Sequence, residues 1–144
     1  GNRQNTIMGC YGIGVGRLMA SICEVKHDKF GPIWPMSIAP WQIHICALRA
    51  DNPDVREKAD ALYDELSKKA EVLFDDRKVS PGFMFSDADL FGVPIRVIIS
   101  PKTLARGVVE LVTRDKSIKE DVAIENCAER ILKLRDEMLA EFDI

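Results

Sequence analysis

The sequence has little of what marks membrane, secreted or metal-binding proteins. No apolar run reaches the roughly 18 residues of a membrane-spanning helix, and the N-terminal stretch GNRQNTIMG lacks the apolar core of a signal peptide. The four cysteines are scattered without a C-x-x-C pair, and the two histidines lie far apart. We therefore expect a cytoplasmic protein with reduced thiols, no membrane contact and no metal site.

A large excess of charge of one sign is also lacking. The chain has 20 basic and 23 acidic residues, which gives a net charge of −3. This balance argues against a whole-chain electrostatic attraction to nucleic acid and leaves recognition by particular side chains open. A length of 144 residues with 47% hydrophobic and 30% charged residues is typical of one globular domain with a short appendage.

Glycines are concentrated near the start, in the stretch GCYGIGVGRL at residues 9–18. The dinucleotide pattern G-x-G-x-x-G, counted from Gly12, would need a glycine where Arg17 stands, and no Lys-Ser or Lys-Thr follows as in a phosphate loop. We predict a strand over 7–13 and then a helix with Arg17 in its first turn. Two interpretations remain open. The glycines let a strand pack closely under a helix, or they let the backbone approach a flat or charged ligand beside Arg17.

Prolines at positions 32, 35 and 40 predict an extended linker over 32–40. Residues 1–31 offer one strand and one helix, too little for a core, and we interpret them as the end of another, larger domain. Residues 41–144 alternate in the order β-α-β-α-β-β-α. We predict an α/β fold in which helices cover a small, mostly parallel or mixed sheet of four to five strands.

Local signals place the elements of this second part. Asn52 and Pro53 are typical of a helix start, as are Ser80 and Pro81, and Gly92 is typical of a helix end. The segment PKTLARG, residues 101–107, is predicted as a turn. The expected strands are 41–49, 71–74, 93–100 and 108–115, and the expected helices are 51–70, 81–91 and 122–142.

Several stretches together carry a resemblance to a known family. GCYGIGVGR resembles motif 3 of class II aminoacyl-tRNA synthetases, in the form found in bacterial-type prolyl-tRNA synthetases. The segments WPMSIAP and DDRKVSPGFMF resemble the C-terminal anticodon-binding domain of the same enzymes. The resemblance covers essentially the whole chain. Its one departure is Gly16, where many class II enzymes carry an acidic residue before the arginine.

The resemblance implies an enzyme that activates proline with ATP and Mg²⁺ and transfers it to the tRNA for proline. It implies that Gly12, Gly14 and Gly16 form a floor under the adenine, and that Arg17 is a catalytic cation that contacts ATP. Motif 2 and the proline pocket do not occur in these residues. We therefore expect no activity and no bound cofactor in this part alone, and a homodimer for the parent enzyme.

The same resemblance assigns anticodon recognition to residues 41–144. Proline anticodons end in two guanines, and a carboxylate accepts both N–H donors on the Watson–Crick edge of guanine. Asp87 matches the acidic position that contacts a guanine in this family. Arg96 is our second choice, because arginine forks to guanine O6 and N7. The remaining candidates, for phosphates, base edges or stacking, are Arg77, Lys78, Phe85 and Asp89.

Each of these candidates also has a purely structural interpretation. Asp87 would be an exposed helix carboxylate, Arg96 a surface charge on a strand, and Phe85 a core aromatic. A different class of function is an anticodon-type domain that serves as a protein-interaction or regulatory module without aminoacylation. The intact GCYGIGVGR stretch argues against that class, because such a module has no need of an ATP floor and its arginine.

Overall fold

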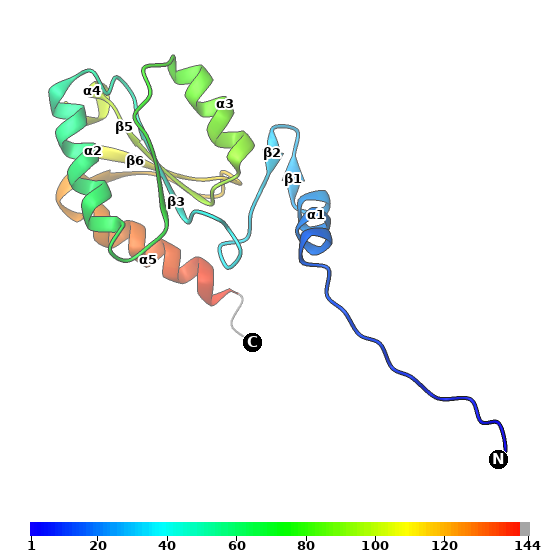
Figure 1. Cartoon of the computed structure of the whole chain (residues 1–144). Helices are drawn as coiled ribbons and strands as arrows, with labels where there is room; N and C mark the ends of the chain where they lie inside the picture. Colours follow the sequence, from blue (N-terminus) through cyan, green and yellow to red (C-terminus); the bar gives the residue numbers. More distant parts are fainter. Residues whose placement is uncertain (142–144) are drawn as a thin grey trace.

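The computed structural model describes residues 1–141, in which a five-stranded sheet carries helices on both faces (Figure 1). The strand order is β4-β3-β5-β6-β7; β3 runs parallel to β4 and β5, while β6 is antiparallel to β5 and β7. The predicted mixed sheet is therefore confirmed. The strands are β3 (Ile43–Ala47), β4 (Val72–Asp75), β5 (Ile95–Ile99), β6 (Val108–Thr113) and β7 (Lys119–Ala123).

The helices begin where the capping residues predict. Asn52 caps α2 (Pro53–Leu66) by accepting hydrogen bonds from the backbone N–H groups of Asp54 and Val55. Ser80 caps α3 (Pro81–Phe91) in the same way, and Gly92 ends it in the left-handed conformation with φ of 70°. The segment predicted as a turn contains a single helical turn, α4 (Pro101–Leu104).

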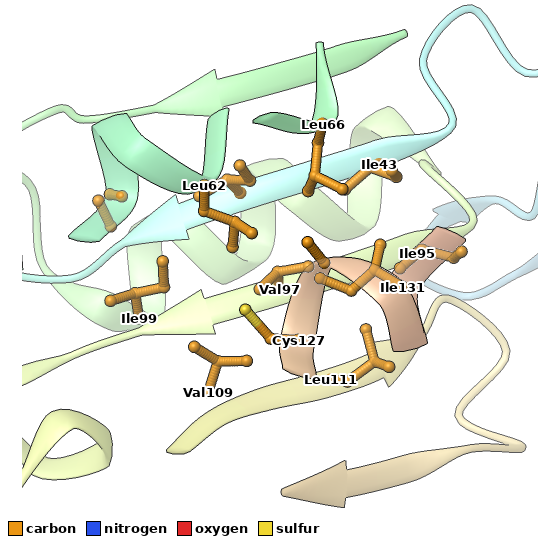
Figure 2. Packing of buried hydrophobic residues seen from close by; sticks show 14 of the residues in the cluster. Ile43, Leu62, Leu66, Ile95, Val97, Ile99, Val109, Leu111, Cys127 and Ile131 are labelled. Atoms are coloured by element: carbon orange, nitrogen blue, oxygen red, sulfur yellow. The ribbon is translucent and has the colours of Figure 1, made fainter. Parts of the chain in front are cut away.

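Two helices and the sheet enclose the main core. Helix α2 and helix α5 (Cys127–Ala140) cover one face, and Figure 2 shows their side chains packed on the strands. Helix α3 packs on the other face, where Met84 and Ala88 meet Cys46 and Ile98. Strand β3 is buried along its whole length, because it lies between these two layers. Side chains of the main core include Ile43, Ile45, Leu62, Leu66, Ile95, Val97, Ile99, Leu111, Cys127 and Ile131.

The strand predicted over 7–13 is wrong. Residues 1–14 form no helix or strand, and Ile7, Met8, Tyr11 and Ile13 are all exposed. A strand requires backbone pairing with a neighbour, and no other segment of residues 1–141 pairs with this one. Helix α1 (Val15–Val25) follows as predicted, but none of its residues is buried.

Three further details differ from the prediction. Residues 27–32 form a small hairpin, β1 (His27–Asp28) with β2 (Gly31–Pro32), which ends where the expected linker begins. Residues 119–123 form the edge strand β7, so the last helix begins at Cys127 instead of at 122. A short 3-10 turn, η1 (Ile124–Asn126), joins the two. The expected end of this helix at 142 lies outside the described residues.

No helix within residues 1–141 combines the length and the apolar character needed to cross a bilayer. The same residues contain no group of three or more histidine, cysteine or acidic side chains arranged to hold a metal ion.

Candidate functional site

The face of the sheet under α3 carries the candidate site. Strand register places His44 of β3 beside Arg96 of β5, Arg96 beside Val112 of β6, and Val112 beside Lys119 of β7. Side chains at matched positions on neighbouring strands point to the same face, so these four form one row across the sheet. Helix α3 covers only part of this face. A groove beside it is lined by Phe85, Asp89, Arg96, Ile98, Glu110, Val112, Lys116 and Lys119.

Arg77 joins the end of β4 to α3. Its guanidinium donates to both carboxylate oxygens of Asp75, at 2.9 and 2.7 Å, and to Oδ2 of Asp87 at 2.7 Å. Burial opposes ionisation of Asp75, yet its hydrogen bonds with Arg77 outweigh burial and lower the pKa of the carboxyl. The hydrogen bonds to Asp75 and Asp87 raise the pKa of Arg77. Arg77 therefore holds Asp87 in a defined position on α3.

A second acidic–basic pair lies further along α3. Arg96 donates to Oδ1 of Asp89 at 2.5 Å, and both side chains are mostly buried, with exposed fractions of 11% and 16%. The Arg96 guanidinium also lies over the Phe85 ring, 5.8 Å from its centroid. Phe85 itself is half-buried against the smaller core. The predicted residues Phe85, Asp89 and Arg96 thus form one cluster.

His44 lies at the β3 end of this row of side chains, and it was not named as a site residue from the sequence. Its side chain is almost fully buried, its ring lies edge-on to Phe91, and neither ring nitrogen has a hydrogen-bond partner within residues 1–141. Burial, reinforced by the positive charge of Arg96, lowers the pKa of His44 to about 4. The imidazole is therefore neutral at physiological pH.

The structure separates the remaining candidates into two places. Lys78 is exposed in the loop between β4 and α3, beside the Arg77 cluster. Gly12 and Gly14 lie on the exposed segment before α1, which extends away from the sheet (Figure 1). Gly16 and Arg17 lie in the exposed first turn of α1. Lys116 and Lys119, which line the groove, were missed. The basic spacing of the segment RDKSIK, residues 114–119, was the available signal.

Comparison with known proteins identifies the family of this domain. A family model described as an anticodon binding domain matches residues 38–134. The chain belongs to the anticodon-binding domain family. It is 52% identical over 127 residues to a proline–tRNA ligase of Dehalococcoides mccartyi, covering 88% of this chain and 22% of that protein. It is 44% identical over 142 residues to a proline–tRNA ligase of Syntrophus aciditrophicus, covering 98% of this chain and 25% of that protein.

Solved structures show the same fold. A prolyl-tRNA synthetase from Cryptosporidium parvum, complexed with L-proline and AMP, matches with a TM-score of 0.75 and 24% identity. The match covers 87% of this chain and 27% of that one. The chain spans about a quarter or less of the length of the curated relatives described above.

Proposed function

We propose that α3, with the groove between it and strands β5–β7 and with the Arg77–Asp87 pair beside the end of β4, binds the anticodon of the tRNA for proline. The observation that carries the proposal is that arginines hold both α3 carboxylates in place: Arg96 holds Asp89 in the groove, and Arg77 holds Asp87 next to the end of β4. Oδ1 of Asp87 has no hydrogen-bond partner within residues 1–141. A carboxylate has about four acceptor positions, so Asp87 accepts from guanine N1–H and N2–H while it keeps Arg77.

The neighbouring side chains take complementary roles in this proposal. Arg96, next to Asp89, offers its fork to guanine O6 and N7. Because Arg77 is already occupied by Asp75 and Asp87, it positions Asp87 instead of binding a phosphate. The exposed lysines beside the site supply the phosphate contacts. These lysines are Lys78, Lys116 and Lys119.

Phe85 has a mixed role. It is partly buried against the small core, and its ring lies under the Arg96 guanidinium. A base that enters the groove therefore stacks on the Arg96–Phe85 pair more readily than on Phe85 alone.

The test is binding of this chain to an anticodon stem-loop that ends in GG, compared with one in which both guanines are replaced by adenine. We expect the GG loop to bind about 10-fold or more tightly, and Asp87→Asn to abolish the difference. Asp60→Asn on α2, which covers the opposite face, is the matched control and should keep the preference. Equal affinity of the native chain for both loops would contradict the proposal and favour a protein-interaction module.

We also infer the organisation of the whole protein. Residues 1–31 are the end of the catalytic domain, 32–40 are the linker, and 41–144 are the anticodon-binding domain. The whole protein is a cytoplasmic homodimer. In it, ATP binds with Mg²⁺ beside proline and is contacted by Gly12, Gly14, Gly16 and Arg17. The exposed apolar side chains of α1 support this inference, because such a surface calls for a covering partner.

Pyrophosphate exchange tests this second inference. A proline–tRNA ligase that contains this sequence should lose most of its proline-dependent ATP–pyrophosphate exchange when Arg17 is replaced by alanine. The 144-residue chain alone should show no exchange above background. Exchange by the pure chain, or an unchanged rate for Arg17→Ala, would contradict it.

A further inference from the structure

Arg114 follows β6 and is the most completely buried charged side chain among residues 1–141, with 2% of the residue exposed. Its guanidinium donates to both carboxylate oxygens of Asp28, at 2.9 and 2.7 Å, and to the carbonyl oxygen of Gly31 at 3.1 Å. Its Nε donates to the carbonyl oxygen of Asp89 on α3 at 3.0 Å. One side chain thus joins the β1–β2 hairpin to the end of α3 that carries a candidate base-reading residue.

Asp28 organises the hairpin from inside. Its carboxylate accepts backbone hydrogen bonds from Phe30 and Gly31, in addition to the pair from Arg114. The hydrogen bond from Arg114 holds the pKa of Asp28 well below its usual range. The carboxylate therefore stays ionised, and the fork between the two side chains is a charge-assisted, bidentate contact.

The hairpin and the segment after it also bind the C-terminal end of α3 through its backbone. A Cβ atom added at Gly31 would lie 2.9 Å from the carbonyl oxygen of Asp89. The Trp34 indole N–H donates to the carbonyl oxygen of Phe91 at 3.0 Å. Carbonyl groups in the last turn of a helix have no partner within the helix. Here Arg114 and Trp34 supply those partners for Asp89 and Phe91.

The contact reaches the base-reading side chains through Asp89. The backbone of Asp89 is held by Arg114, and its carboxylate is held by Arg96. On the other side, the N–H of Ile33 donates to the carbonyl oxygen of Lys26, which follows α1. A continuous set of hydrogen bonds therefore runs from the end of α1, through the hairpin and Arg114, to Arg96 in the groove.

We propose that Arg114, held by Asp28, is a positioning residue that sets the C-terminal end of α3 for anticodon recognition. In this proposal the β1–β2 hairpin contributes to anticodon recognition, because it holds Arg114 through Asp28. The inference rests on the proposed function for its consequence in RNA binding, but the positioning itself is measured without RNA.

The experiment compares three variants of the 144-residue chain. Arg114→Lys keeps the charge but removes the fork, because lysine is a point donor. Asp28→Asn removes the charge of the partner, while the contacts of Arg114 to Asp89 and Gly31 remain available. Asp121→Asn is the matched control, because it weakens the exposed pair between Arg106, which precedes β6, and Asp121 on β7.

Two readouts separate positioning from a general loss of stability. The first is the ratio of affinities for the GG and AA stem-loops, which a smaller folded fraction alone does not change. We expect it to fall about 10-fold in Arg114→Lys and clearly in Asp28→Asn, with an unchanged dependence on salt. The second is hydrogen exchange of the backbone amides of residues 88–92 relative to those of strands β3 and β5, which we expect to be faster in both variants and unchanged in the control.

The outcomes decide the inference separately from the proposed function. An unchanged affinity ratio in folded variants overturns it. If the native chain itself shows no GG preference, the proposed function fails. In that case hydrogen exchange decides the positioning role: faster exchange of amides 88–92 in the variants would sustain it, and unchanged exchange would overturn it. Should Arg114→Lys fail to fold by circular dichroism, Asp28→Asn decides both readouts.

Discussion

The backbone at Gly92 touches the carbonyl group of Pro32, so closely that a Cβ atom at Gly92 would collide with the oxygen. Gly92 also has a φ of 70°, which L side chains rarely adopt. Gly107 has almost the same φ, 69°, but nothing lies within 4 Å of its Cβ position. An alanine at Gly107 therefore measures only the cost of the left-handed backbone, whereas an alanine at Gly92 adds the steric clash with Pro32.

We expect Gly107→Ala to destabilise the fold by about 1 kcal/mol, from the left-handed backbone alone. Gly92→Ala should cost about 1–3 kcal/mol more, because the linker has to move away from the end of α3. Urea unfolding of both variants measures the difference. Equal losses of stability in the two variants would show that the linker does not contact the end of α3 in solution.

His44 should make the domain sensitive to mild acid. Its pKa is about 4 in the folded chain against an ordinary value of 6.5, so between these values the unfolded chain binds more protons. The free energy of unfolding should therefore fall by roughly 3 kcal/mol as the pH drops from 6.5 to 4. His44→Leu should flatten this part of the profile. Asp28 and Asp75 also have lowered pKa values, and their ordinary value is 3.8. Protonation of these two carboxylates therefore lowers the free energy of unfolding only below about pH 3.8.

Arg77 and Lys78 should affect RNA binding in different ways, although they are adjacent. Arg77→Lys releases Asp87, so we expect the preference for the GG loop to fall about 10-fold. Lys78→Ala removes an exposed charge, so it should weaken both loops alike and reduce the salt slope by about one. Titrations at several salt concentrations measure both quantities. A reversed result would exchange the roles proposed for the two residues.

The core formed by α2 and α5 should dominate stability. Leu66 is fully buried between α2 and the sheet, and Leu66→Ala should cost about 2–5 kcal/mol. Ile7 is 99% exposed on the N-terminal segment, and Ile7→Ala should stay within about 0.5 kcal/mol of the native chain. Thermal and urea unfolding of the two variants measure this contrast. A large effect of Ile7→Ala would indicate that the segment packs on the domain in solution.

Much of the fold was predictable from local signals. Helices α2 and α3 begin at Asn52 and Ser80 because these side chains bond the free N–H groups of the first turn, and α3 ends at Gly92 because glycine tolerates the left-handed conformation. The buried strand β5 was visible as an apolar run, and β3 as a segment of alternating, strand-favouring residues. Asp87 was named from a resemblance and Arg77 from its place after a strand, and the structure brings the two together.

Other features escaped prediction because they depend on partners distant in the chain. Residues 7–13 have the composition of a strand but have no strand to pair with in the described chain, whereas the polar segment KEDVA forms β7 because β6 offers it an edge. The sequence identified the residue types that can read a base and the caps that begin α2 and α3. Only the tertiary structure decided that Arg114 meets Asp28 and Asp89, and that His44 is buried beside Arg96. Such contacts join separate elements, and they follow from the packing of the sheet and its helices, which no local pattern encodes.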